Sequence, residues 1–204
     1  MIEKILPISE KKIEILREIY EEESTHLRKI SAELKIHPYQ TKKIIDRLVS
    51  DKVVEQKRAG KTILLTINRL SENIEQLIYL IECYKQKTEN KILKGIIKNV
   101  SLFYKNKEIL CCCIFGSYAR GAETKESDVD ILFIMKNKNA EAEIAKKISQ
   151  VGTLLHLKFN PVFMDEKEFL RTLEIKEPAL ATMLKPSQRI IIFGIEYIVK
   201  QTFS

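Results

Sequence analysis

Apolar residues in the first third of the chain recur at helical spacing in three short stretches. Each stretch begins beside a residue that favours a helix N-terminus: Ser9 for the first, Ser24 or Thr25 for the second, and Pro38 for the third. Residues 53–57 and 62–67 then alternate as strands do, and Gly60 lies in the turn between them. This pattern predicts three helices and a β-hairpin in a first domain, residues 1–70.

The pattern changes after residue 70. Two amphipathic stretches occupy residues 71–106, and the sequence Thr88-Glu89-Asn90 interrupts them. These stretches predict a helical connector, which also offers a surface for a homodimer.

From Glu108 onwards the pattern is first typical of a strand, and then segments typical of strands and of helices alternate. Residues 109–115 form a continuous apolar run, as expected of a strand buried on both faces. Downstream, the pattern predicts strands over 128–135, 158–164 and 189–193, and helices over 140–155 and 165–173. This alternation predicts an α/β or α+β sheet domain over residues 107–204.

Basic residues outnumber acidic ones, which gives a formal net charge of +7 and an isoelectric point near 9.1. Such a charge favours polyanionic partners, namely nucleic acid or nucleotides. The side chains expected to contact DNA lie on the third predicted helix and around the hairpin tip: Tyr39, Gln40, Lys42, Lys43, Arg47, Lys57, Arg58 and Lys61. Most acids of this domain lie within residues 10–23, away from that side.

The first 70 residues resemble the winged helix-turn-helix modules of small prokaryotic transcriptional regulators. The order of elements and the placement of the basic residues carry the resemblance. It implies binding to double-stranded DNA, with the third helix in the major groove and the hairpin as a β-wing. The alternative is a winged helix used only for protein contacts.

A second motif occupies residues 115–133, which read FGSYARGAETKESDVDILF. Gly116 and Ser117 follow the apolar strand, where backbone amides and a hydroxyl can approach a triphosphate, and Arg120 can add a cation. Asp128 and Asp130 are two residues apart on the next expected strand, so their carboxylates share one face. A pair of carboxylates can hold Mg²⁺. Catalysis and metal binding are therefore assigned to Asp128 and Asp130.

This segment resembles the signature of the DNA polymerase beta-like nucleotidyltransferase superfamily, particularly its small "minimal nucleotidyltransferase" members. The resemblance implies an α+β fold, a mixed sheet flanked by helices. It also implies a nucleoside triphosphate as substrate, Mg²⁺ or Mn²⁺ as cofactor, and transfer of a nucleoside monophosphate to an acceptor hydroxyl. Gly116 and Ser117 would bind the triphosphate, and Asp128 and Asp130 the metal.

One departure from the family pattern concerns the third acidic residue, which the resemblance places in the middle of the next strand. Lys158 or Asn160 stands at that position, and Asp165 lies only at the strand's end. A lysine or an asparagine cannot replace a bridging carboxylate, so this departure favours nucleotide binding over rapid turnover.

Composition and targeting signals predict a cytoplasmic protein. The longest apolar run, residues 109–115, is far shorter than the roughly 20 residues of a membrane-spanning helix. The sequence Met1-Ile2-Glu3-Lys4 does not look like the start of a signal peptide. The four cysteines make no zinc-binding pattern and are expected to be small apolar core residues.

Three functions are compatible with these features. The first is a Mg²⁺-dependent nucleotidyltransferase that its winged helix directs to DNA. The second is a transcriptional regulator whose nucleotidyltransferase-like domain senses a nucleotide or mediates assembly with little or no turnover. The third is an antitoxin-like role, in which the domain modifies a protein partner.

Overall fold

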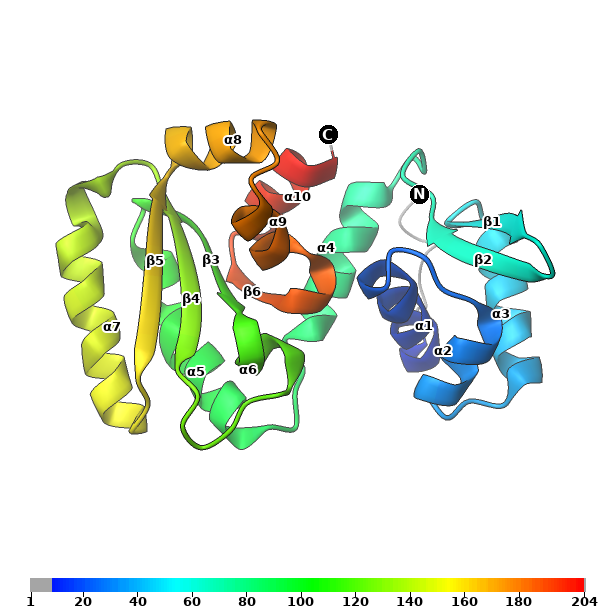
Figure 1. The fold of residues 1–204 in the computed structure, drawn as a ribbon, viewed down its shortest axis with the longest axis horizontal. Helices are drawn as coiled ribbons and strands as arrows, with labels where there is room; N and C mark the ends of the chain where they lie inside the picture. Colours follow the sequence, from blue (N-terminus) through cyan, green and yellow to red (C-terminus); the bar gives the residue numbers. More distant parts are fainter. Residues whose placement is uncertain (1–8, 204) are drawn as a thin grey trace. The chain divides into compact units, whose positions relative to one another are not determined.

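The computed structural model describes residues 9–203, apart from the side chain of Phe203, so the first residues of the sequence lie outside it. The chain divides into two compact units, Met1–Tyr84 and Lys85–Ser204 (Figure 1). The elements of the first unit are α1 (Glu10–Glu21), α2 (Leu27–Glu33), α3 (Pro38–Ser50), β1 (Val54–Ala59), β2 (Thr62–Ile67) and α4 (Ile74–Lys85), whose last residue crosses the boundary.

The first three helices of this unit follow the predicted order, with one correction at a helix start. Ser9 caps α1, because its side chain accepts a hydrogen bond from Lys12 N. The N-cap of α2 is His26, and neither Ser24 nor Thr25 takes that position. Thr25 instead forms a β-bridge with Leu65, through backbone hydrogen bonds of 3.1 and 2.8 Å. The bridge holds Thr25 extended, and the helix therefore begins after it.

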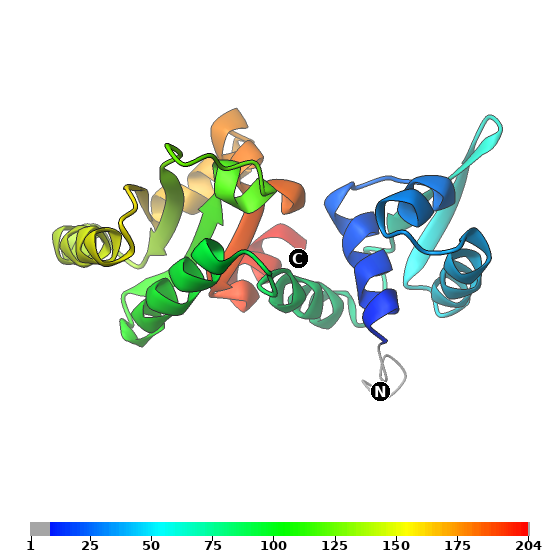
Figure 2. The same cartoon turned by 90° about the horizontal axis from the view of Figure 1, so that it is seen from below.

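The hairpin of the first unit is longer than predicted. β1 and β2 pair in antiparallel register from Val54↔Ile67 to Ala59↔Thr62, so Lys57 and Arg58 lie within β1. Only Gly60 and Lys61 form the turn, and Gly60 has a φ of 60°. Figure 2 shows the hairpin reaching beyond the helices of its own unit.

The two amphipathic stretches predicted as one connector belong to different units. Within the first unit, α4 is joined to α1 by a buried hydrogen bond of 2.8 Å from Tyr20 Oη to Glu82 Oε1. A second bond of 3.3 Å runs from Tyr84 Oη to Glu14 Oε1. The other stretch forms α5 in the second unit, where Asn90 caps it. The boundary between the two units therefore falls at the last residue of α4.

The second unit is a mixed sheet between helices (Figure 1). Its elements are α5 (Lys91–Ser101), η2 (Leu102–Lys105), β3 (Ile109–Phe115), α6 (Gly116–Arg120), β4 (Val129–Met135), η3 (Lys138–Ala140), α7 (Glu141–Leu155), β5 (Phe159–Asp165), α8 (Glu166–Glu174), α9 (Pro178–Leu184), η4 (Pro186–Gln188), β6 (Arg189–Phe193) and α10 (Ile195–Phe203). The strand order is β5-β4-β3-β6, and only β4 and β5 run parallel. The predicted α+β class, with a mixed sheet flanked by helices, is confirmed.

Helices cover both faces of this sheet, and the strands β3, β4 and β6 are mostly buried. Alternate residues of β3, β4 and β6 form one core with α5 and α7, and Phe133 stacks on Phe163 within it. The other face carries α8 and α10, which contact β4 and β3 respectively. Cys111, Cys112 and Cys113 are free thiols buried in β3, and burial raises the pKa of Cys112 well above its ordinary value. These three cysteines are core residues, as predicted.

Within residues 9–203, no helix is both long and apolar enough to span a membrane.

Candidate functional site

The two halves of the motif in residues 115–133 meet because β3 and β4 are antiparallel. The last residue of β3, Phe115, pairs with Asp130 near the start of β4. The chain turns at Gly116 into the short helix α6, so Gly116 and Ser117 lie next to that carboxylate. Asp128 directly precedes β4, and Val129 between the two acids is fully buried. The structure thus brings together the residues that the sequence assigned to triphosphate and metal.

Gly116 is where the backbone of the turn comes closest to Asp130. Its φ is 72°, a backbone conformation that residues with a Cβ rarely adopt. A Cβ at this position would lie 2.3 Å from Asp130 Oδ2. Only glycine therefore allows the turn after β3 to close onto the carboxylate.

The parallel strand β5 supplies the residues beside the two acids. Asn160 is the register partner of Asp130, and its Nδ2 donates a hydrogen bond of 3.0 Å to Asp130 Oδ1. Lys158 precedes β5 and donates from Nζ to Asp128 Oδ2 at 2.7 Å. Its carbonyl oxygen accepts a 2.8 Å hydrogen bond from Val129 N, which fixes this segment to the start of β4. The sequence left Lys158 and Asn160 as alternatives, and both face the acidic pair.

Asp165 does not join the acidic pair. It pairs with Met135 at the far end of β4, five residues along β5 from Asn160, or about 16 Å at the usual rise of a strand. Its Oδ1 accepts a 2.8 Å hydrogen bond from Glu168 N, so Asp165 is the N-cap of α8. Its role here is structural.

Arg120 is the last residue of α6. Its side chain is held by Gln188, a residue that the sequence did not indicate. Its Nη1 donates a 3.1 Å hydrogen bond to Gln188 Oε1. Gln188 ends η4, and the next residue, Arg189, pairs with Phe115 across β3 and β6. No motif marks residues 186–188. The contact of Gln188 with Arg120 could therefore be predicted only with the knowledge that β6 pairs with β3.

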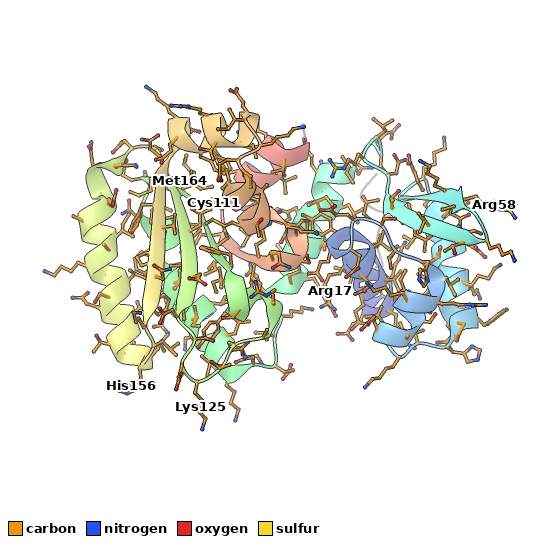
Figure 3. All side chains as sticks on the ribbon, in the orientation of Figure 1. Arg17, Arg58, Cys111, Lys125, His156 and Met164 are labelled. Carbon is orange, nitrogen blue, oxygen red and sulfur yellow. The ribbon has the colours of Figure 1, made fainter. Side chains whose placement is uncertain are left out.

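The loop between Gly121 and Asp128 is held by its own hydrogen bonds. Ser127 Oγ accepts a 2.9 Å hydrogen bond from Thr124 N, and Thr124 O accepts one of 3.2 Å from Ser127 N. Figure 3 shows Lys125, in the middle of this loop, pointing away from the sheet. This turn returns the chain to β4 and delivers Asp128 to the site.

Asp128 and Asp130 are the two carboxylates of this site that could bind a metal, and no third carboxylate lies beside them in the described residues. Among residues 9–203, no three His, Cys, Asp or Glu side chains gather closely enough to hold a metal ion. The neighbours from β5 are instead an ammonium and an amide N–H group, both of which donate to the acids.

The residues predicted to contact DNA lie on α3 and the hairpin, and all eight are exposed: Tyr39, Gln40, Lys42, Lys43, Arg47, Lys57, Arg58 and Lys61. Tyr39 exposes 72% of its surface. Lys42 pairs with Asp46 at 3.1 Å and Arg47 with Asp51 at 3.2 Å, so two of the cations on α3 are partly compensated. Arg58 lies on the outer part of the hairpin (Figure 3).

Comparisons with known proteins address the second unit. Residues 97–180, which run from α5 into α9, match the family described as polymerase beta, nucleotidyltransferase. A putative protein adenylyltransferase of Methanocaldococcus jannaschii is 36% identical over 70 residues, which make up 34% of this chain and 69% of the relative. No solved structure matches the chain significantly. The matched family segment contains the whole arrangement of α6, β4 and β5.

Proposed function

The chain belongs to the polymerase beta nucleotidyltransferase family, and from that membership we propose a DNA-binding protein whose second unit binds a nucleoside triphosphate. The observation that carries the nucleotide site is the closure of Gly116 onto Asp130. It leaves the Ser117 hydroxyl and the Arg120 guanidinium on one short helix beside the acids. Hydroxyl and guanidinium groups are suited to phosphate oxygens.

Nucleotidyltransferases of this family generally use a divalent metal with the nucleotide. The residues of this chain do not fit a two-metal centre, because β5 presents donors where such a centre needs a third carboxylate. We therefore propose that the site binds the nucleotide but transfers it only slowly to an acceptor hydroxyl. A regulator that responds to a bound nucleotide fits this balance.

A second candidate function is modification of a protein partner. The name of the Methanocaldococcus jannaschii relative, a putative protein adenylyltransferase, favours ATP as the nucleotide and a protein hydroxyl as the acceptor. An antitoxin-like role would be one instance of it.

The first unit is, in this proposal, a winged helix-turn-helix that binds double-stranded DNA through α3 and the hairpin. Support comes from the exposed cations on these elements and from the length of the hairpin, which carries Lys57, Arg58 and Lys61 away from the helices. A homodimer is also part of the proposal, since α5 leaves Ile92 half exposed.

The nucleotide site can be tested by thermal unfolding. ATP with Mg²⁺ should raise the melting temperature, because a ligand at a hundredfold excess over its Kd stabilises the native state by about 2.7 kcal/mol. The double variant Arg120→Ala/Lys158→Ala should lose most of this shift, since it removes the cation on α6 and the cation that pairs with Asp128. Arg58→Ala/Lys61→Ala, which removes the same charge from the first unit, should keep it. No shift with ATP or GTP in the unaltered protein would refute the nucleotide site.

DNA binding can be tested with the same two double variants in the reverse roles. Arg58→Ala/Lys61→Ala should weaken binding to every duplex and flatten the dependence of affinity on salt by about two counterions, because phosphate contacts release counterions. Arg120→Ala/Lys158→Ala should leave the DNA affinity unchanged. Fluorescence anisotropy across a salt titration measures both quantities. Equal losses in the two variants would mean that net charge, and not the hairpin, attracts the DNA.

A further inference from the structure

The charge beside Asp128 is the feature that goes furthest beyond the family pattern. Lys158 Nζ lies 2.7 Å from Asp128 Oδ2, and the backbone bond from Val129 N to Lys158 O anchors the residue at the edge of β4. The Lys158 side chain is 79% exposed and that of Asp128 36%. The ammonium is therefore held at the carboxylate and is still free to turn toward solvent.

A divalent cation in a nucleotidyl-transfer site has an electrostatic task. It neutralises the carboxylates, so that a polyanionic triphosphate can approach them, and it offers positive charge to the phosphate oxygens. Lys158 already offsets the charge of Asp128 through its 2.7 Å ion pair, and Arg120 adds a second cation on the short helix that begins at Gly116. The approach of a triphosphate therefore depends less on an added cation to cancel the acids.

The hydrogen bonds at the two acids also argue against a bound metal. A divalent cation such as Mg²⁺ requires oxygen ligands. The β5 neighbours turn N–H groups toward both acids, Lys158 toward Asp128 and Asn160 toward Asp130. A metal would have to displace both groups, and it would gain no carboxylate from β5.

We infer that Lys158 supplies the positive charge that a divalent cation supplies elsewhere, so that this site binds a nucleoside triphosphate without metal. The inference rests on the proposed nucleotide site and names the residue that sets its cofactor requirement. Lysine is suited to the task, because its ammonium is a compact charge on a flexible stem and can contact phosphate oxygens as a point charge.

The test is isothermal titration of the full chain with ATP, once in EDTA and once in millimolar Mg²⁺. The unaltered protein should bind ATP with affinities that differ by less than about threefold between the two buffers. Lys158→Gln should lose about tenfold in EDTA, and added Mg²⁺ should recover part of that loss. Lys158→Arg, which keeps the charge, should behave like the unaltered protein. Thermal unfolding of each variant checks that it folds.

The matched control is Lys147→Gln, which removes an exposed lysine that pairs with Glu143 on α7. It should bind ATP like the unaltered protein in both buffers. Binding by the unaltered protein that needs Mg²⁺ would overturn the inference and leave the nucleotide site intact, as would Lys158→Gln binding unchanged in EDTA. Absence of ATP binding in both buffers would instead refute the proposed nucleotide site itself.

Discussion

Replacing Asn160 by aspartate should make the stability of the second unit depend on divalent metal. The substitution exchanges the 3.0 Å hydrogen bond between Asn160 and Asp130 for two carboxylates at a similar separation. Like charges at that distance raise the pKa of one of the two groups and destabilise the folded state. In EDTA near neutral pH we expect a loss of about 1 kcal/mol, limited by the partial exposure of the site.

The sign of the pH dependence follows from the raised pKa. The unfolded chain ionises more readily than the folded variant, so stability falls as pH rises above the ordinary carboxyl range. In mild acid, one carboxyl is protonated and the loss disappears. Mn²⁺ or Mg²⁺ at neutral pH should restore the melting temperature, because the acid at position 160 joins Asp128 and Asp130 as a third oxygen ligand.

The same variant should transfer nucleotide faster than the unaltered protein. We expect a gain of about tenfold or more, equal to about 1.4 kcal/mol of transition-state stabilisation. Labelled ATP, Mg²⁺ and a cell extract as the source of acceptor provide the assay. Asn99→Asp is the control, since Asn99 also donates through Nδ2, here to Gly95 O at 2.8 Å, but lies on α5. Fast transfer by the unaltered protein would mean that three acids are not needed.

Gly116→Ala should abolish measurable ATP binding and also destabilise the second unit. Left-handed backbone costs a residue with a Cβ about 1–2 kcal/mol. The 2.3 Å approach to Asp130 Oδ2 adds a steric cost of about 1–3 kcal/mol, the usual range for overpacking. Rotating the Asp130 side chain would relieve the overlap, but it would break the hydrogen bond from Asn160. Either response displaces the carboxylate from the turn.

Gly121→Ala separates these two costs. Gly121 ends α6 with a φ of 65°, and a Cβ there would have no atom within 4 Å. This variant should therefore lose only the conformational part, about 1–2 kcal/mol, and should still bind ATP. Chemical denaturation and ATP titration of both variants make the comparison. If Gly116→Ala behaved like Gly121→Ala in both measurements, the close approach to Asp130 would have no functional importance.

Local patterns in the sequence predicted much of this structure. The apolar run over 109–115 coincides with β3, because a strand buried on both faces leaves an uninterrupted hydrophobic signal. The order of glycine, serine and the two acids was sufficient to bring Gly116 and Asp130 together, since the motif combines a strand, a turn and the next strand. Asp165 was correctly separated from them at the strand's end.

Pairings between distant segments could not be predicted in the same way. The choice between Lys158 and Asn160 depended on where the two side chains point. Both reach an acid, because Asn160 on β5 lies beside Asp130 and Lys158, just before β5, lies beside Asp128. Gln188 contacts Arg120 only because β6 inserts next to β3. The helices α9 and α10 were not predicted, since short helices at the end of a chain give a weak periodic signal.

The pairing of β5 with β4 also has a genetic consequence. Asparagine and aspartate codons differ by one A-to-G change at the first base, and the same change turns a lysine codon into a glutamate codon. The two donors that face Asp128 and Asp130 are therefore each a single mutation away from a carboxylate. Close homologues could gain or lose the third acid repeatedly while keeping the same backbone. The residues at positions 158 and 160 would then be the first to compare when such sequences are sorted into binders and enzymes.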